Sequence, residues 1–168
     1  RSSNMEVKAT IAFEERGAVG DNGWNSKVLR GYDPQLGVEL AFKRIDKSKL
    51  GDPAKLFDES KAIQHGRHRN VVEVKYACQT EDHVWIAMPL YPRGSVQALM
   101  NHRFLTAREV INFGIGMLAA LQNIHSRKLV HLDVKPANIL IADTGEAVLA
   151  DFGCARPVDE NMLADPAA

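Results

Sequence analysis

Short runs of β-branched and aromatic residues fill the first half of the chain, and turn-forming residues separate one run from the next. This pattern predicts strands. A hairpin connection is expected at residues 33–37, where the sequence DPQLG supplies turn-forming Asp, Pro and Gly. A helix is expected over 52–66, because Asp52 and Pro53 are helix-start signals and Gly66 is a stop signal. The five predicted strands are residues 10–14, 27–32, 38–45, 71–77 and 84–88.

The second half of the chain contains one long helical pattern. Thr106 followed by Glu109 forms a capping box, which opens a helix expected over 106–127. Its apolar residues form a stripe through Phe113 and Leu121 and extend around most of the circumference. A helix that is apolar nearly all round is normally buried on several sides.

Charge and composition place the chain among ordinary soluble globular domains. Its 168 residues hold 21 Lys and Arg against 21 Asp and Glu, so there is no broad basic surface for nucleic acid. The longest apolar run, residues 113–121, is nine residues long, whereas a bilayer-spanning helix needs about 20, so no transmembrane segment is expected. Two cysteines without C-x-x-C spacing indicate neither a disulfide scaffold nor a structural zinc site, which favours a cytoplasmic location.

The sequence HLDVKPAN at residues 131–138 is followed, 18 positions after Asp133, by Asp151-Phe152-Gly153. These segments resemble two motifs of the protein kinase family, H-R-D-x-K-P-x-N in the catalytic loop and D-F-G at the metal site. Eight family positions match, which composition alone would produce with a chance on the order of 10⁻¹⁰. The matching residues are His131, Asp133, Lys135, Pro136, Asn138, Asp151, Phe152 and Gly153.

The resemblance implies a catalytic site that uses ATP and Mg²⁺. Phosphoryl transfer depends mainly on positioning and on neutralising phosphate charge, so it needs oxygen ligands for Mg²⁺ and an acceptor for the hydroxyl proton. By resemblance, Asn138 and Asp151 would hold Mg²⁺, and Asp133 would accept or orient the proton of the attacking hydroxyl. Lys135 would lie beside the transferred phosphoryl group, and a lysine at this position points to Ser/Thr substrates.

Upstream residues complete the site that the resemblance implies. Ala41-Phe42-Lys43 resembles the family's V-A-I-K, which makes Lys43 a ligand of the α- and β-phosphates and Glu59 its ion-pair partner. Adenine would bind main-chain groups of a hinge that includes Met88 and Tyr91. The implied ATP-binding residues are Gly23, Val28, Ala41, Lys43, Met88, Pro89, Tyr91 and Leu140, and the implied internal apolar stack is Ile63, Val74, His131 and Phe152.

Two positions depart from the family pattern. The three glycine positions of G-x-G-x-x-G correspond to Asp21, Gly23 and Ser26, so only the middle position is a glycine. We therefore expect weaker or differently shaped nucleotide binding. Leu132 stands where most regulated members have Arg, a residue that normally pairs with a phosphorylated side chain of the activation loop. We therefore expect activity that this charge pair does not control.

The resemblance also implies the fold and its boundaries. We expect an α+β, bilobal protein-kinase-like fold, with an antiparallel-sheet N-lobe that carries one helix and the beginning of a helical C-lobe. The N-lobe is expected over 5–88, the hinge over 89–94 and a partial C-lobe over 95–168, while residues 1–4 are expected to be an engineering scar or disordered. The family continues past D-F-G, so we expect a kinase domain truncated in its activation segment. Self-association or a partner chain would then cover the helix over 106–127.

The leading hypothesis is a Ser/Thr protein kinase that transfers the ATP γ-phosphate to a hydroxyl of a protein substrate. One alternative is a nucleotide-binding pseudokinase or scaffold module, which the altered glycine loop favours and the complete set of charged motif residues opposes. A second alternative is a small-molecule phosphotransferase of kinase-like fold. Those enzymes usually lack counterparts of Lys135 and of Phe152-Gly153, so these residues argue against it.

Overall fold

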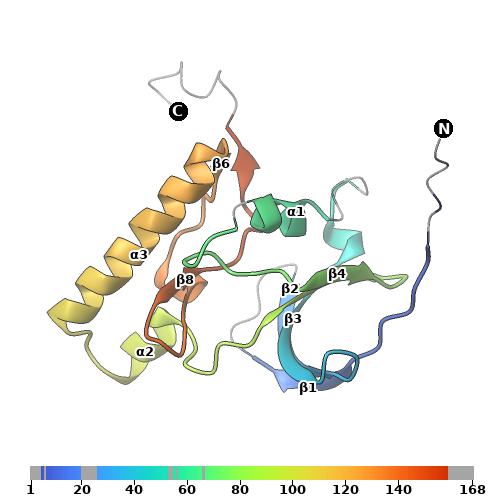
Figure 1. The fold of residues 1–168 in the computed structure, drawn as a ribbon, viewed down its shortest axis with the longest axis horizontal. Helices are drawn as coiled ribbons and strands as arrows, with labels where there is room; N and C mark the ends of the chain where they lie inside the picture. Colours follow the sequence, from blue (N-terminus) through green and yellow to red (C-terminus); the bar gives the residue numbers. More distant parts are fainter. Residues whose placement is uncertain are drawn as a thin grey trace.

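A five-stranded antiparallel sheet forms one end of the molecule (Figure 1). The computed structural model describes residues 5, 7–19, 26–52, 55, 57–65 and 67–158. The strands lie in the order β1-β2-β3-β5-β4, so β3 is central and pairs with both β2 and β5. Their bounds are β1 Glu14–Ala18, β2 Ser26–Asp33, β3 Val38–Asp46, β4 Tyr76–Gln79 and β5 His83–Pro89.

Three predicted strands, 27–32, 38–45 and 84–88, are confirmed as β2, β3 and β5. The strand predicted over 10–14 is wrong, because β1 begins at Glu14. Just before it, Phe13 lays its ring on Phe42, with ring centroids 4.0 Å apart and an interplanar angle of 14°. The segment therefore covers a face of the sheet with a side chain before it joins the sheet through its backbone.

The strand predicted over 71–77 is also largely wrong, because β4 begins at Tyr76. Val71 and Val72 are buried, but their backbone bonds lead away from the sheet. Val71 forms a single bridge with Leu149, and the Val72 N–H donates to the Leu149 carbonyl at 2.9 Å. These valines therefore join the two halves of the molecule, which explains why their apolar run looked like a strand.

The hairpin predicted at residues 33–37 is confirmed. The Asp33 carboxylate accepts the N–H groups of Gln35 at 2.8 Å and Leu36 at 2.9 Å, and Gly37 takes φ +70°. The Tyr76 hydroxyl also donates to Asp33. This hydrogen bond, followed by the backbone N–H bonds, lowers the pKa of Asp33 against the opposing effect of burial.

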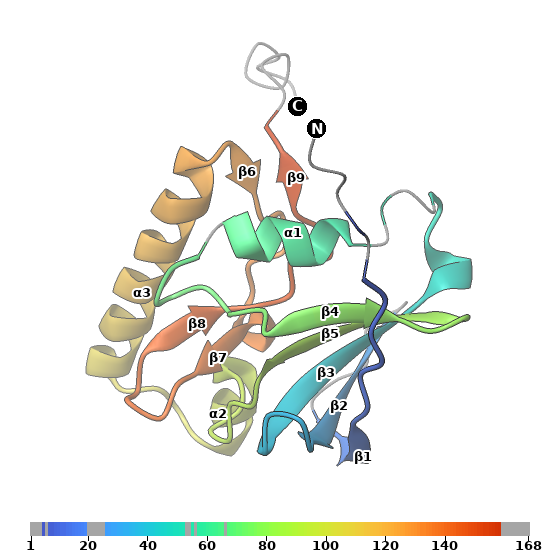
Figure 2. The ribbon, with the colours of Figure 1, turned by 45° about the vertical axis from the view of Figure 1, so that its right-hand side comes forward.

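The helix α1, Asp58–His65, lies beside the sheet next to β4 (Figure 2). It begins later than the predicted start at residue 52, and the short 3-10 helix η1, Lys47–Lys49, precedes it. Further along the chain come α2, Val96–His102, and α3, Ala107–Ser126. The remaining elements are β6 Leu129–Val130, η3 Pro136–Asn138, β7 Ile139–Ile141, β8 Ala147–Leu149 and β9 Arg156–Pro157.

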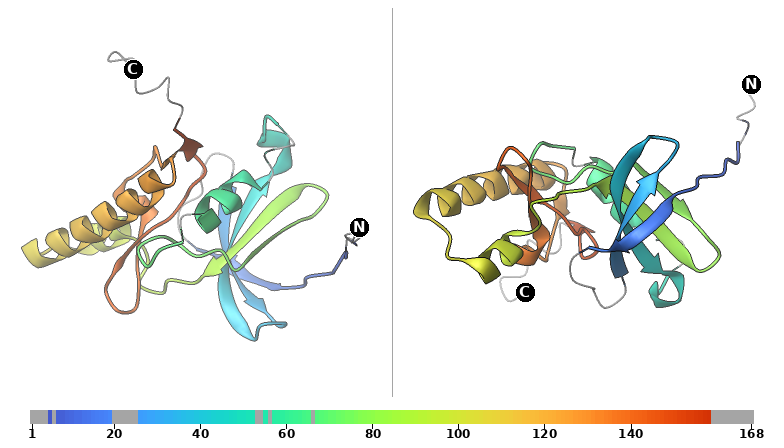
Figure 3. Two further views of the ribbon diagram at one scale, coloured as in Figure 1. Left: turned by 45° about the horizontal axis from the view of Figure 1, so that its top comes forward. Right: turned by 90° about the horizontal axis from the view of Figure 1, so that it is seen from below.

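The predicted capping box of α3 is confirmed. Thr106 Oγ1 accepts the Glu109 N–H at 3.2 Å, and the Glu109 carboxylate accepts the Thr106 N–H at 2.9 Å. Gly116 allows α3 to pack closely on its neighbours, because an added Cβ would lie 3.1 Å from Asn70 Nδ2 and 3.2 Å from Ala147 Cβ. Views in two further directions show α3 and the five-stranded sheet at opposite ends of the molecule (Figure 3).

One face of α3 packs into the main apolar core, which also includes residues of α1, β7, β8 and the D-F-G segment. The expectation that α3 is buried on several sides is not met by this structure. Its other face is open to solvent, and the exposed fractions on it range from 55% at Val110 to 69% at Leu118. The apolar residues on this exposed face are Val110, Ile111, Ile115 and Leu118.

Candidate active site

Three charged side chains from separate elements meet between the sheet and the core. Lys43 on β3 places its Nζ 2.6 Å from Glu59 Oε1 on α1 and 2.8 Å from Asp151 Oδ1. The partners lie 16 and 108 positions away along the sequence, so tertiary structure alone brings them together. Lys43 is 6% exposed, and such a buried cation needs partners of opposite charge.

The protonation of this triad follows from competition between burial and charge. Burial raises the pKa of Glu59, and the Lys43 cation only partly opposes that rise. Burial disfavours the charge of Lys43, but the carboxylates of Glu59 and Asp151 outweigh it and raise the pKa of the lysine. Burial likewise disfavours the charge of Asp151, yet Lys43 prevails and lowers the pKa of that carboxyl. Each of the three groups therefore depends on the others for its charge state.

The loop before β7 holds a second cluster, centred on Asp133. Asn138 Nδ2 donates to the Asp133 carbonyl at 2.8 Å and to Asp133 Oδ2 at 2.9 Å. Lys135 Nζ lies 3.2 Å from the same Oδ2. The Asp133 side chain is 32% exposed and that of Lys135 53%, so both remain open to a substrate. This geometry fixes one carboxylate oxygen between an amide and a cation.

His131 anchors this loop from inside the core, where it is 1% exposed. Its Nδ1 accepts the Asp133 N–H at 3.2 Å, so Nε2 carries the proton that is donated to the Ala150 carbonyl at 2.9 Å. The ring also packs edge-on against Phe152, with centroids 4.8 Å apart. The histidine thereby connects the Asp133 loop to the segment that carries Asp151.

Two of the three non-glycine residues with positive φ in the described part of the chain lie in the same two segments. Leu132 has φ +65° and Asp151 has φ +55°, in the left-handed region that residues with a Cβ seldom adopt. Such outliers persist where surrounding contacts over-determine them, and they cluster at active sites. The Asp151 turn is held by its Oδ1, which accepts the Gly153 N–H at 3.2 Å.

The residues present fit a magnesium ion that is shared with a nucleotide. Asn138 uses its amide nitrogen on Asp133, which leaves its carbonyl oxygen for a hard cation. The Asp151 side chain is 43% exposed and uses Oδ1 on Lys43 and Gly153. In the described part of the chain, no group of three or more His, Cys, Asp or Glu side chains is suited to a metal. Mg²⁺ commonly takes one or two protein ligands and fills its octahedron with phosphate oxygens and water.

The residues predicted for adenine binding lie on neighbouring strands and beside the core. Ala41 on β3 pairs with Met88 on β5, and Val28 on β2 pairs with Lys43. Three further residues predicted for adenine binding pack against the main core: Met88, Tyr91 and Leu140. The predicted apolar stack also belongs to this part of the molecule. Val74 packs against the main core, and the other members, Ile63, His131 and Phe152, are buried. The glycine-rich loop positions Asp21 and Gly23 lie outside the described residues.

Sequence reasoning missed the backbone groups of the site. The Ala150 carbonyl orients His131, and the Gly153 N–H holds Asp151. Every residue has these atoms, so no signal in the sequence could distinguish them. Among the described residues, no helix is both long and apolar enough to cross a membrane.

Comparison with known proteins identifies the family. The family model described as "Protein kinase domain" matches residues 13–166. The chain belongs to the protein kinase family. The predicted fold class is thereby confirmed, because the five-stranded antiparallel sheet with α1 is the N-lobe of a bilobal kinase fold.

Curated relatives support the same assignment. The chain is 31% identical to a probable serine/threonine-protein kinase of Dictyostelium discoideum over 163 residues, which cover 94% of this chain and 26% of that protein. It is 32% identical to an L-type lectin-domain containing receptor kinase of Arabidopsis thaliana over 165 residues, 95% of this chain and 23% of that protein. It is 34% identical to a serine/threonine-protein kinase of Schizosaccharomyces pombe over 139 residues, 79% of this chain and 35% of that protein. The chain thus spans about a third or less of the length of these relatives.

Proposed function

We propose that the chain is the nucleotide-binding and catalytic part of a Ser/Thr protein kinase, which uses ATP and Mg²⁺ to phosphorylate a hydroxyl of a protein substrate. The observation that carries the proposal is the contact of Lys43 Nζ with both Glu59 and Asp151. A buried lysine held between two carboxylates is a preorganised cation for phosphate oxygens, and such preorganisation is the main source of catalysis in phosphoryl transfer.

Each charged group then has a distinct role. Lys43, held in place by Glu59, binds the α- and β-phosphate oxygens. Asp133 accepts a hydrogen bond from the substrate hydroxyl and orients its oxygen toward the γ-phosphoryl group. Lys135, 3.2 Å from Asp133, balances the negative charge that develops beside it. Mg²⁺, held by Asn138 and Asp151, would neutralise charge on the nucleotide phosphates.

The ATP-binding role extends to the residues around adenine. Val28, Ala41 and Leu140 contact the faces of the base, and main-chain groups of Pro89 and Tyr91 bind its edge. Met88, which pairs with Ala41 across the sheet, is proposed to limit the depth of the adenine pocket. Gly23 is proposed to cover the phosphates.

The Ser/Thr class rests on Lys135 and on the names of relatives, which include serine/threonine-protein kinases of Dictyostelium discoideum and Schizosaccharomyces pombe. One relative is named as a receptor kinase, so the cytoplasmic location of the chain stays a prediction. The domain limits, 5–88 for the N-lobe, 89–94 for the hinge and 95–168 for the C-lobe portion, are proposed on the same family resemblance.

The pseudokinase alternative rests on Asp21 and Ser26, which replace two glycines of the phosphate loop. The test compares Mg·ATP binding and transfer of labelled phosphate for this chain, for a longer chain that includes it and for Asp133→Asn. We expect Asp133→Asn to retain nucleotide binding and to lose about 10²- to 10⁴-fold in transfer. Asp143→Asn, at an exposed position in the β7–β8 turn, is the matched control and should behave as wild type. Nucleotide binding without transfer in every unmutated chain would establish the pseudokinase function instead.

A further inference from the structure

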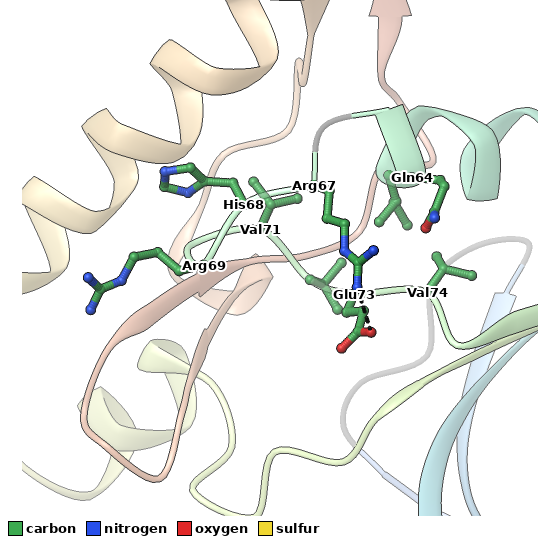
Figure 4. A pocket seen from close by; sticks show the side chains of 9 residues that line it. Gln64, Arg67, His68, Arg69, Val71, Glu73 and Val74 are labelled. Carbon is green, nitrogen blue, oxygen red and sulfur yellow. Dashed lines mark ion pairs between the residues drawn. The ribbon is translucent and has the colours of Figure 1, made fainter.

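The hollow beside the C-terminal end of α1 is lined by core residues and leaves little apolar surface open. Figure 4 shows this hollow of about 260 Å³, with Gln64 on α1 and Val74 in the segment that leads into β4. Three further lining residues, Ile63, Val71 and Val72, are between 1% and 4% exposed. Here the apolar core is closed by its own residues. The outer face of the five-stranded sheet differs, because a residue from outside the sheet covers it.

Phe42 lies on the face of the sheet that points away from the charged triad of Lys43. The two residues are neighbours on β3, and successive side chains of a strand point to opposite faces. Phe42 is nevertheless 0% exposed, and it forms a buried cluster with Leu40 and Ala87, which we call the outer cluster. The partly buried aromatic side chains that pack against the outer cluster are Phe13, Tyr76 and Trp85.

Phe13 is the covering residue that comes from outside the sheet. It lies just before β1, in the segment drawn blue where the chain leads into β1 in Figure 2. Its ring is stacked on Phe42, and it meets Trp85 edge-on with ring centroids 5.1 Å apart. Gly31 on β2 makes room for the Phe42 ring, because an added Cβ would lie 2.7 Å from Phe42 Cε2. The Phe42 ring is therefore confined between β2 and the Phe13 ring.

A chain of hydrogen bonds holds the segment that carries Phe13. The Ala12 N–H donates to Gln35 Oε1 at 2.9 Å, and Gln35 Nε2 donates to Asp33 Oδ1 at 3.0 Å. The other carboxylate oxygen of Asp33 accepts the Tyr76 hydroxyl. The residue before Phe13 is thus tied to the β2–β3 turn and, through that turn, to β4.

Trp85 shows that packing holds the aromatic cover in place. Its Nε1 is buried and has no hydrogen-bond partner among the described residues. A buried donor that is left unpaired favours any position in which it can reach water. The ring contact with Phe13 opposes such a movement, so removing the Phe13 ring would free the indole to turn and would loosen the cover of Phe42.

We propose that Phe13 is a positioning residue for Lys43, which holds β3 in place from the outer face of the sheet. Lys43 reaches Glu59 and Asp151 from β3, so a shift of this strand changes both contacts, at 2.6 and 2.8 Å. Phe13 acts through Phe42, the neighbour of Lys43 on the strand, and is not itself a ligand of the nucleotide. Its effect on nucleotide affinity rests on the proposed phosphate-binding role of Lys43.

Mg·ATP binding to the 168-residue chain, measured by isothermal titration calorimetry, tests the effect on affinity. Phe13→Ala should weaken binding about three- to tenfold, the size of effect that residues without ligand contact exert on a distant site. Phe13→Tyr keeps an aromatic ring at this half-buried position and should restore wild-type affinity. Ile11→Ala removes an apolar side chain that is 40% exposed in the same segment, and this matched control should bind as wild type does. Unchanged affinity in Phe13→Ala would overturn the proposal.

A double-mutant cycle in urea unfolding tests the link to Lys43 without any nucleotide. It compares wild type, Phe13→Ala, Lys43→Met and the double variant. If Phe13 acts through Lys43, Phe13→Ala should lower the free energy of unfolding less in the Lys43→Met background, because the ion pairs that it supports are already lost. Equal losses in both backgrounds would show that Phe13 only stabilises the sheet, and the proposal would be wrong. A wild-type chain that binds no Mg·ATP would refute the proposed function, while the cycle would still decide the role of Phe13.

Discussion

Replacing Lys43 with methionine should destabilise the protein as well as inactivate it. The side chains of Lys43 and Glu59 are 8% and 9% exposed, so the variant leaves a buried carboxylate next to Asp151 without the cation between them. Removing one partner of a buried ion pair typically costs about 3–5 kcal/mol. For a chain of 168 residues, that loss corresponds to a fall in melting temperature of roughly 6–20 °C.

The loss should depend on pH, because Glu59 can take up a proton. Burial raises the pKa of Glu59 even beside Lys43, and removing the cation raises it further. A carboxyl whose folded pKa lies above its unfolded value contributes stability that is present at low pH and lost as the pH rises through the folded pKa. The deficit of Lys43→Met should therefore be smaller near pH 4.5, the ordinary pKa of a glutamate, than at pH 8, where more of the Glu59 carboxyl is ionised. Loss of the Asp151 pair contributes at both pH values, because Lys43 lowers the pKa of that carboxyl.

Thermal unfolding followed by circular dichroism at pH 4.5 and pH 8 measures this effect. The double variant Lys43→Met with Glu59→Gln should recover much of the stability lost at pH 8, because a neutral amide replaces the unpaired carboxylate. Lys27→Met on the neighbouring strand β2 is the control for the loss of a lysine and should change little at either pH. A melting temperature of Lys43→Met equal to that of wild type at both pH values would contradict the prediction. So would a loss of melting temperature that is the same at both pH values and is not reduced by adding Glu59→Gln.

Three further predictions concern stability and association. Tyr76→Phe removes the hydrogen bond that most lowers the pKa of Asp33, so it should reduce the melting temperature at neutral pH. The difference in melting temperature between Tyr76→Phe and wild type should vanish as the pH falls below the folded pKa of Asp33. A loss of melting temperature that is the same at every pH would contradict this prediction. Thr106→Ala removes the N-cap of α3 and should cost about 1 kcal/mol in urea unfolding, whereas Thr106→Ser should retain most of it. The exposed apolar face of α3 should make the 168-residue chain self-associate in sedimentation, and Leu118→Glu, at a position 69% exposed, should shift it toward monomer. A wild-type chain that sediments as a stable monomer of 18.6 kDa would exclude self-association through α3.

Local signals predicted the parts of the fold that depend on local interactions. The hairpin at residues 33–37 forms because Asp33 binds the backbone of its own turn, and the α3 cap forms because Thr106 and Glu109 are three residues apart. The strand predicted over residues 71–77 is largely wrong, because an apolar run indicates burial but does not identify the backbone partner. Val72 bonds to Leu149, 77 positions away, and no local pattern contains that information.

The motifs named the side chains of the candidate site but not their arrangement. Lys43, Asp133 and Asp151 stand at motif spacings that the sequence displays directly. The link from His131 to the Ala150 carbonyl is formed by a backbone atom, and the positive φ of Asp151 is imposed by its surroundings. These features could not be predicted, because they depend on contacts between segments.

The sequence by itself determined the family, the residue types of the site and the balanced charge of the chain. Tertiary structure decided which charges interact, since it placed Lys43 within 2.8 Å of two carboxylates from distant segments and removed all three groups partly from water. The energy of a charge pair depends on separation and on the surrounding dielectric, and both are properties of the folded chain.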